Sequence, residues 1–181
     1  MNPLFIPDGI FPDFRRVTPS LLRERGIRFI FSDIDNTLAT YDDPLPPPDV
    51  LAWRTSMEEA GIAVILVSNN NAARVDSFAE ALGTRAYPKA GKPGKRTMLR
   101  ALADAGAKPE ESLCLGDQLL TDCAAGRRCG MTVFLVPPIA DRTTLFWRVK
   151  RRLERPHIRA YLAAHPDTDT AGNGWDVWRL T

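Results

Sequence analysis

The sequence predicts a single α/β domain built on a doubly wound parallel sheet. Apolar runs without polar alternation recur along the 181-residue chain, as expected for parallel strands that are covered on both faces. Helix-like stretches separate these runs, and several of them stop at a glycine. Strands that alternate with helices favour right-handed βαβ units, and hence three layers of helix, sheet and helix.

Four segments are predicted as buried strands, because they are continuous apolar runs, several of them rich in β-branched and aromatic residues. They are residues 27–32, 62–67, 112–115 and 132–136. A further short strand is predicted at residues 85–87. All of these segments are short enough to be strands and not helices.

Helices are predicted at residues 50–60, 72–82, 95–105 and 119–128. Asp49 is the expected N-cap of the first helix, after a proline-rich stretch that breaks any regular element. Gly83 and Gly106 are the expected C-caps of the second and third helices, and the fourth stops near Gly130.

A basic segment at residues 142–159 is predicted to be helical as far as Pro156, and residues 165–181 are polar. We therefore expect one domain at residues 1–160, which includes an N-terminal extension, and a polar C-terminal tail at residues 161–181.

Composition narrows the class of protein. The chain has 24 Lys and Arg against 22 Asp and Glu, and a net charge of +2 does not by itself imply a nucleic-acid or membrane partner. Cys114, Cys123 and Cys129 have no CxxC spacing, which favours reduced thiols in a cytosolic protein. The sequence shows neither a signal peptide nor an apolar run of about 20 residues. We expect a cytoplasmic protein, or one attached to the inner face of a membrane.

Polar residues follow three of the predicted strands, where functional side chains gather in open parallel sheets. The candidate site residues are Asp33, Asp35, Ser68, Asn69, Lys92, Asp117 and Asp122. Clustered carboxylates repel one another unless a cation neutralises them, and hard oxygen ligands favour magnesium or calcium. A lysine and a hydroxyl suit the charged oxygens of a phosphoryl group, and a pair of carboxylates can supply a nucleophile and an acid/base.

These residues lie in motifs that resemble those of the haloacid dehalogenase-like (HAD) phosphatases. The segment DIDNTL from Asp33 resembles the first motif, DxDx[TV], and Ser68 the second. Lys92, within GKP, resembles the third motif, and GDQLLTD from Gly116 resembles the fourth, GDxxxxD. The resemblance covers roughly residues 28–138, in the family's order. DIDNTL, VSNN, GKP and GDQLLTD together resemble the YqeG-type branch, which is related to phosphatidylglycerophosphate phosphatases.

The resemblance implies a HAD-like fold and a role for each residue. Asp33 would be the nucleophile that becomes an aspartyl-phosphate, and Asp35 the acid/base. Magnesium would be held by Asp33, by the backbone carbonyl of Asp35 and by Asp117, with Asp122 acting directly or through water. The phosphoryl group would be bound by Ser68 and Lys92, with Asn69 as a helper.

The short spacings between the motifs predict that no cap domain is inserted. Residues 35–62 and 68–92 leave room for little more than a helix and its loops. The resulting open site would suit a large substrate, one presented at a surface, or one enclosed by a second subunit. We expect a phosphatase of phosphatidylglycerophosphate; the alternatives are soluble metabolites or nucleic-acid ends.

Two readings from another class of protein stay open on the sequence alone. A signalling receiver domain also uses an aspartate, magnesium, a hydroxyl and a lysine, but its acidic pair is adjacent and its phosphorylated aspartate lies on a later strand. A binding protein that kept the fold without turnover would be marked by loss of Asp33 or Asp35, and both are present.

The basic segment admits two interpretations. Within it, a run of basic residues consists of Arg148, Lys150, Arg151, Arg152, Arg155 and Arg159, with Phe146, Trp147 and Leu153 interspersed. It is either a solvated helix packed by its apolar side, or a site of peripheral attachment to anionic lipid, helped by insertion of the apolar N-terminus. No specific nucleic-acid partner is expected, and the oligomeric state is left open.

Overall fold

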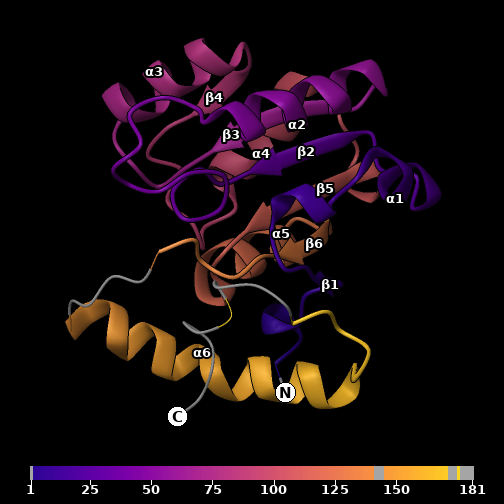
Figure 1. Ribbon diagram of the computed structural model, residues 1–181, viewed down its shortest axis with the longest axis vertical. Helices are drawn as coiled ribbons and strands as arrows, with labels where there is room; N and C mark the ends of the chain where they lie inside the picture. Colours follow the sequence, from indigo (N-terminus) through magenta and orange to yellow (C-terminus); the bar gives the residue numbers. More distant parts are fainter. Residues whose placement is uncertain (1, 141–144, 171–174, 176–181) are drawn as a thin grey trace.

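Six parallel strands form one sheet in the order β1-β6-β5-β2-β3-β4 (Figure 1). The strands are β1 Gly9–Ile10, β2 Phe29–Ser32, β3 Ala63–Val67, β4 Arg85–Tyr87, β5 Ser112–Gly116 and β6 Thr132–Leu135. The computed structural model describes residues 2–140, 145–170 and 175, with side chains in the last helix from residue 149 onward. The predicted contributions of Phe146, Trp147 and Arg148, and most of the tail beyond residue 170, therefore lie outside the described residues.

All five predicted strands are confirmed, and the α/β class with them. The two-residue strand β1 was not predicted; it extends the sheet beyond β6. In the apolar N-terminus, which was expected to help membrane attachment, Ile10 and Phe14 are buried in the core.

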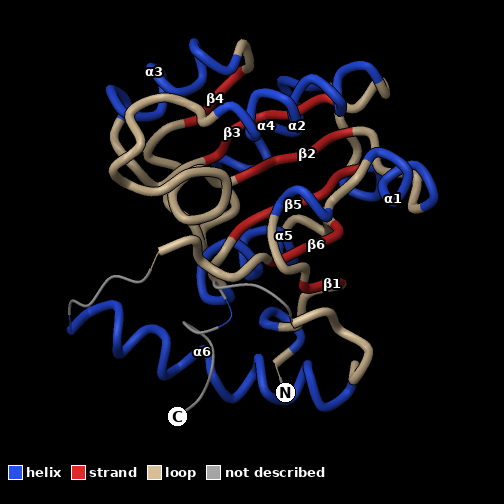
Figure 2. Tube along the Cα trace, in the orientation of Figure 1, coloured by secondary structure: helices blue, strands red, loops and turns tan. Residues whose placement is uncertain are grey.

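Helices cover both faces of the sheet (Figure 2). Helices α1 Pro19–Glu24, α2 Pro48–Glu59 and α3 Ala72–Leu82 bury side chains in the cluster on one face. Helices α4 Arg96–Ala105, α5 Ala124–Arg128 and α6 Leu145–Ala164 bury theirs in the cluster on the other face. Successive residues of a strand contribute to the clusters on opposite faces of the sheet, as Ile30 and Phe31 of β2 do, because their side chains point in opposite directions.

The helix boundaries confirm some of the expected signals and correct others. Gly83 and Gly106 end α3 and α4 with positive φ values of 69° and 64°, as predicted. Asp49 is not an N-cap, because α2 begins earlier with Pro48 in its first turn. Proline lacks an N–H group that the first turn would leave unpaired, so it is well suited to start a helix.

The segment predicted as one helix at residues 119–128 has two parts. Residues Leu119–Cys123 form a π-helical turn, and α5 follows it. Short π-helical turns are often found at functional sites. Helix α1 was not predicted.

Helix α6 runs along one end of the molecule and continues through Pro156, where the prediction ended it (Figure 1). Pro156 and Arg152, whose carbonyl it leaves unpaired, both lie on the exposed side of the helix, so water can satisfy that carbonyl. Beyond the proline, Ile158 and Tyr161 are buried in the core, and this burial stabilises the continued helix.

No cap domain interrupts the described motif region. Between Asp35 and β3 the chain forms a loop and α2, and between Ser68 and Lys92 it forms α3 and β4. Within the described parts of the chain, no helix combines the length and the apolar character that crossing a bilayer requires.

Candidate active site

The predicted site residues lie at the carboxyl edge of the sheet. The ends of β2, β3 and β5 are level, since Ser32 pairs in register with Leu66 of β3 and with Leu115 of β5. Chain segments that follow these strands therefore meet at one place. All of the predicted residues except Asn69 are buried: Asp33, Asp35, Ser68, Lys92, Asp117 and Asp122.

A tight turn after β2 fixes the two aspartates of the first motif. Asn36 has φ of 65°, in the left-handed region that asparagine tolerates better than most residues. Its N–H group donates to the carbonyl of Ala39 at 2.7 Å, and the N–H groups of Leu38 and Ala39 donate to the carbonyl of Ile34. The main chain thereby forms a compact turn immediately after Asp35, and Ala39 makes a parallel bridge with Asp35.

Lys92 lies at the centre of the site. Its Nζ lies 2.9 Å from Asp33 Oδ1 and 2.6 Å from Asp122 Oδ1, and it donates to the carbonyl of Val67 at 2.7 Å. Burial by itself would lower the pKa of Lys92, but the carboxylates of Asp122 and Asp33 raise it above its ordinary value. Lys92 is therefore a permanent cation that joins the first and fourth motifs.

Asn69, which lies just after the end of β3, fixes the main chain of Lys92. Its Oδ1 accepts from the N–H group of Lys92 at 2.8 Å, and its Nδ2 donates to the carbonyl of the same residue at 3.0 Å. Ser68 Oγ accepts from the N–H group of Asn70 at 3.1 Å. Both Ser68 and Asn69 also line the cavity described below.

Three carboxylates form a cluster that suits a divalent cation. Asp33, Asp117 and Asp122 each offer an oxygen, and these atoms lie within 4.8 Å of one another. Burial raises the pKa of Asp33 to about 6 and that of Asp117 to about 7, with Lys92 and Arg151 respectively acting in the opposite direction. Asp117 Oδ1 is buried and has no hydrogen-bond partner among the described residues. A buried carboxylate oxygen that has no hydrogen-bond partner and lies beside two other carboxylates is well suited to bind a hard metal ion.

Gly116 makes room for this cluster. A Cβ atom at this position would lie 2.4 Å from Cβ and Cγ of Asp122, which is far inside van der Waals contact. Only glycine therefore lets the fourth motif fold back so that Asp122 reaches Lys92. Asp122 Oδ2 accepts from the N–H group of Gln118 at 3.2 Å, which closes the same turn.

Asp35 lies apart from the three clustered carboxylates and has its own partners. Asn70 Nδ2 donates to Asp35 Oδ2 at 2.8 Å, and Arg74 Nη2 lies 3.3 Å from Asp35 Oδ1. Arg74 also donates to the carbonyls of Thr40 and Asp43. The two aspartates of the first motif thus have separate environments, as a nucleophile and an acid/base would need.

A cavity of about 580 Å³ joins these groups. Its walls carry Asp33, Asp35, Ser68, Asn69, Lys92 and Asp122 from the predicted set. Further wall residues were not predicted; they are Tyr41, Asn70, Gln118, Thr121 and Lys150. Lys150 of α6 donates to Oε1 of Gln118, another residue of the cavity wall.

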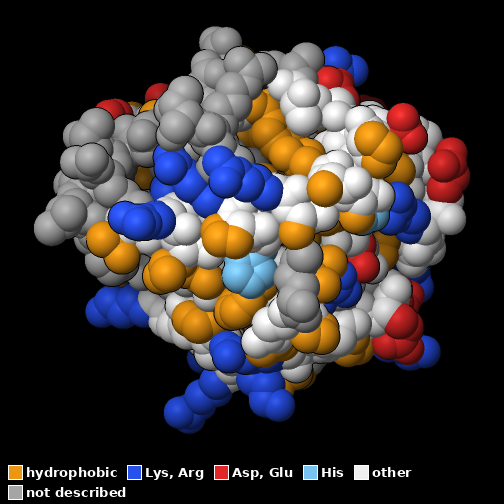
Figure 3. Space-filling model, turned by 90° about the horizontal axis from the view of Figure 1, so that it is seen from below, with side chains coloured by type: hydrophobic (Ala, Val, Ile, Leu, Met, Phe, Trp, Pro, Cys, Tyr) orange, Lys and Arg blue, Asp and Glu red, His pale blue; other side chains and the backbone are white. Residues whose placement is uncertain are grey.

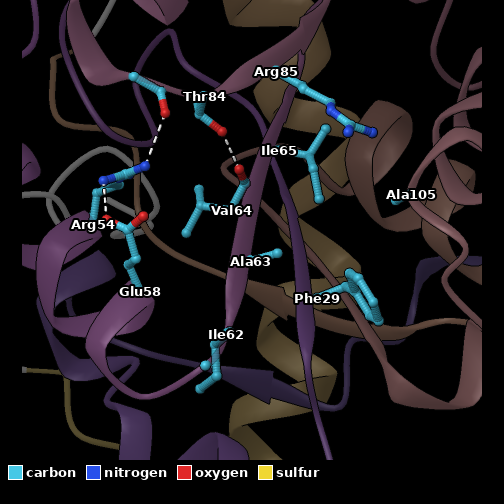
Figure 4. A pocket seen from close by; sticks show the side chains of 12 residues that line it. Phe29, Arg54, Glu58, Ile62, Ala63, Val64, Ile65, Thr84, Arg85 and Ala105 are labelled. Carbon is cyan, nitrogen blue, oxygen red and sulfur yellow. Dashed lines mark hydrogen bonds and ion pairs between the residues drawn. The ribbon is translucent and has the colours of Figure 1, made fainter.

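A second cavity of about 430 Å³ lies at the opposite, amino-terminal edge of the sheet (Figure 4). None of the predicted site residues lines it. Its walls are β3 from Ala63 to Ile65 and the residues that flank it, including Phe29, Arg54 and Arg85.

Several partners of the site carry no recognisable sequence signal. Arg74 is an ordinary residue in the first turn of α3, and Arg151 and Glu154 belong to the basic segment. Asn70, next to Ser68 and Asn69, could have been found from its place after a strand.

Comparisons with known proteins agree with the geometry. Residues 89–138 match the model of a family described as HAD-hydrolase-like. Over 160 residues the chain is 39% identical to "Probable phosphatase YqeG" of Bacillus subtilis (strain 168), which covers 88% of this chain and 93% of that protein. A shorter stretch of 46 residues is 44% identical to a phospholysine phosphohistidine inorganic pyrophosphate phosphatase of Xenopus laevis, over 25% of this chain and 17% of that protein.

The fold is also similar to that of solved phosphatases. The cobalt-bound deoxy-D-mannose-octulosonate 8-phosphate phosphatase of Haemophilus influenzae aligns with a TM-score of 0.53 at 16% identity, over 76% of this chain and 90% of that one. The corresponding enzyme of Moraxella catarrhalis, in complex with magnesium, phosphate and the sugar acid, aligns with a TM-score of 0.52 at 16% identity, over 80% and 97% of the two chains.

Proposed function

Because this chain belongs to the HAD-like hydrolases and is a phosphatase similar to YqeG, we propose that it hydrolyses phosphomonoesters through an aspartyl-phosphate on Asp33, with magnesium. The observation that carries the proposal is the meeting of Asp33, Asp117 and Asp122 with Lys92 at the end of the sheet. Such an excess of negative charge would suit a divalent cation, and a cation held there would supply charge neutralisation for a phosphoryl group.

In the first step, an oxygen of Asp33 attacks phosphorus and the bond from phosphorus to the leaving oxygen breaks. Asp35, as the carboxylic acid, donates its proton to that oxygen. In the second step, Asp35 takes a proton from water, and the water oxygen attacks phosphorus. The bond between Asp33 and phosphorus then breaks, which releases phosphate and restores both residues.

The other residues bind and orient the reacting groups. Lys92 neutralises Asp33 and the phosphoryl oxygens, while Ser68 donates a hydrogen bond to one of those oxygens and Asn69 keeps Lys92 in place. Magnesium would be held by Asp33, Asp117 and the carbonyl of Asp35, with Asp122 acting directly or through water. When bound, it supplies charge neutralisation at the phosphoryl oxygens.

The proposed mechanism is tested by phosphate release from a generic aryl phosphate with and without magnesium. Asp33→Asn keeps the shape of the side chain but lacks the nucleophilic charge, so we expect a loss on the order of 10³-fold or more. Asp104→Asn, the same change on the exposed side of α4, is the matched control and should keep full activity. Equal activity of Asp33→Asn and wild type would sink the mechanism.

For the substrate we propose phosphatidylglycerophosphate, with peripheral contact to an anionic membrane at its inner face. On α6, Val149 and Leu153 are 52% and 58% exposed, and Arg152 and Arg159 are exposed beside them. Seen from the α6 side, basic and apolar side chains share much of the surface (Figure 3). A helix face that mixes apolar and basic residues suits the interface of an anionic bilayer. Lys150 links this helix to the cavity wall.

Two experiments separate this substrate from its alternatives. Phosphate release is compared between phosphatidylglycerophosphate in mixed micelles, soluble phosphomonoesters and a 5′-phosphorylated oligonucleotide; a preference for either of the last two would overturn the lipid. Cosedimentation with anionic vesicles is measured for wild type and for Arg152→Gln/Arg159→Gln. Each cation near such a surface contributes about 1 kcal/mol, so binding should weaken roughly 30-fold.

The division into a domain at residues 1–160 and a tail at residues 161–181 stays a prediction. Limited proteolysis followed by mass spectrometry tests it: cleavage should begin beyond residue 160 and leave the phosphatase domain intact.

A further inference from the structure

The last helix, α6, contacts one of the predicted metal ligands through the side chain of Arg151. Arg151 of α6 has a side chain that is 6% exposed, and its Nη2 lies 2.9 Å from Oδ2 of the fully buried Asp117. Its Nη1 also donates to the main-chain carbonyl of Asp117 at 3.3 Å. A guanidinium thus contacts both the side chain and the main chain of one candidate metal ligand.

A second carboxylate keeps Arg151 in this position. Glu154, three residues further along α6 and 1% exposed, accepts from Arg151 Nη1 at 2.9 Å. The other oxygen of Glu154 accepts from the N–H group of Leu120 at 3.3 Å. Helix α6 is therefore bound both to the end of β5 and to the π-helical turn that carries Asp122.

The contact with Arg151 determines which oxygen of Asp117 is presented to the site. Oδ2 is held by the guanidinium, whereas Oδ1 has no hydrogen-bond partner among the described residues and lies buried beside Asp33 and Asp122. A carboxylate held through one oxygen cannot rotate freely, so the plane of Asp117 is fixed. Arginine suits this task because its planar fork offers donors in fixed directions.

We propose that Arg151 is a positioning residue of the metal site, which holds Asp117 so that Oδ1 is directed at the cation. Helix α6, far from the four motifs in sequence, thereby completes the centre. The proposal rests on the proposed function in so far as the three carboxylates bind a divalent cation. It is tested by metal binding itself, and not by turnover alone.

The test is calorimetric titration of the full-length protein with MgCl₂. Loss of a residue that orients a metal ligand typically weakens metal binding 10- to 100-fold, so Arg151→Gln should raise the Kd for Mg²⁺ by about that factor. Arg151→Lys keeps the charge but loses the planar fork, and an intermediate Kd is expected. Arg100→Gln, the same kind of change on an arginine of α4 whose side chain is 76% exposed, should leave the Kd within about twofold of wild type.

A double-mutant cycle shows whether the effect passes through Asp117. If Arg151 acts on the metal through this ligand, Arg151→Gln should weaken Mg²⁺ binding no further once Asp117→Asn is present. Additive losses would mean that Arg151 acts elsewhere. Circular dichroism shows which variants are folded, and Arg151→Lys carries the test if Arg151→Gln does not fold.

The outcomes separate this inference from the proposed function. If wild type binds no Mg²⁺, the proposed metal site fails and the positioning role fails with it. If wild type binds Mg²⁺ and folded Arg151→Gln binds it equally well, the metal site stands and the role of Arg151 is overturned, even where activity falls. Tighter binding by Arg151→Gln would also overturn it, because the guanidinium would then merely compete with the cation.

Discussion

The two edges of the sheet carry cavities of similar size but opposite character. The cavity at the carboxyl edge, about 580 Å³, is lined by buried charged groups that face one another. The cavity at the amino edge, about 430 Å³, is lined by strand backbone and apolar side chains, with Arg54, Glu58 and Arg85 on its walls (Figure 4). The two cavities therefore differ mainly in how far their charged side chains are buried and clustered, and not in size.

At the amino edge the arginines hold the framework together. Arg54 donates to the carbonyl of Gly83 at 2.8 Å, where α3 ends, and Arg85 donates to the carbonyl of Asp104 at 2.9 Å, where α4 ends. At the carboxyl edge, in contrast, Asp33, Asp117 and Asp122 are concentrated in a way that disfavours folding without a cation. A concentration of charge that costs stability indicates a binding site more reliably than a hollow does.

The largest difference between the two edges should appear when one basic residue is removed from each, Lys92 at the carboxyl edge and Arg54 at the amino edge. Lys92→Met leaves Asp33 and Asp122 buried without their shared ammonium, so the free energy of unfolding in EDTA should fall by about 3–5 kcal/mol. Urea denaturation measures this fall, and added Mg²⁺ should restore part of it by taking over the charge. Full stability of Lys92→Met in EDTA would show that the buried ammonium is dispensable.

The next largest effect is expected from Gly116→Ala. Its new Cβ would overlap Asp122, so the fourth motif must shift, with a loss of about 1–3 kcal/mol and reduced phosphatase activity. Ala63→Ser adds one atom at the exposed start of β3, beside the other cavity, and should change stability by no more than about 0.5 kcal/mol. A melting curve and an aryl phosphate assay compare the two; wild-type values for Gly116→Ala would mean that the turn has room to spare.

A different kind of effect is the pH dependence of the stability of the metal-free protein. Burial raises the pKa of Asp33 to about 6 and that of Asp117 to about 7, above the ordinary value of 3.8. Between these values the folded state binds more protons than the unfolded one, so stability should fall as pH rises from about 4 to 7. Thermal unfolding in EDTA should show this slope, weakened in Asp117→Asn and kept in Asp104→Asn. A slope of opposite sign would contradict the raised pKa values.

The smallest effect should come from Arg54→Gln at the amino edge. Arg54 forms an ion pair with Glu58 one turn along α2, and the two side chains are 24% and 62% exposed. With the bond to Gly83 included, the loss of stability should be about 1 kcal/mol, without change in kcat/KM. A clear change in kcat/KM would mean that the two edges are coupled, and would break the distinction between them.

Local signals predicted much of the fold. The apolar runs gave β2, β3, β5 and β6 because parallel strands are buried on both faces, and glycine gave the ends of α3 and α4. Strand β1 was not predicted, because two residues are too few to show a hydrophobic pattern. Helix α6 passed Pro156 because burial of Ile158 and Tyr161 outweighs a lost hydrogen bond, and burial of this kind is tertiary.

The residues of the candidate site also divide into those that local sequence signals predict and those that depend on tertiary contacts. Asp33, Ser68 and Asp117 were foreseen, since parallel strands that end at one edge must bring them into one region. Asn70 and Gln118, which follow β3 and β5 in the same way, were not. Arg74 and Arg151 were not foreseen, because their contacts with Asp35 and Asp117 span 39 and 34 positions. Which arginine of a basic segment turns inward depends on how its helix docks.

The distance along the chain between Asp117 and Arg151 also has a consequence for synthesis. The 34 positions that separate them take roughly two to seven seconds to translate at about 5–20 residues per second. Once Asp122 has been added, early in that interval, a nascent chain holds every aspartate of the proposed centre, but the arginine that orients one of them has not been made. The order of synthesis thus makes α6 the last piece of the site, and a chain released early would carry the motifs of a phosphatase without a finished metal centre.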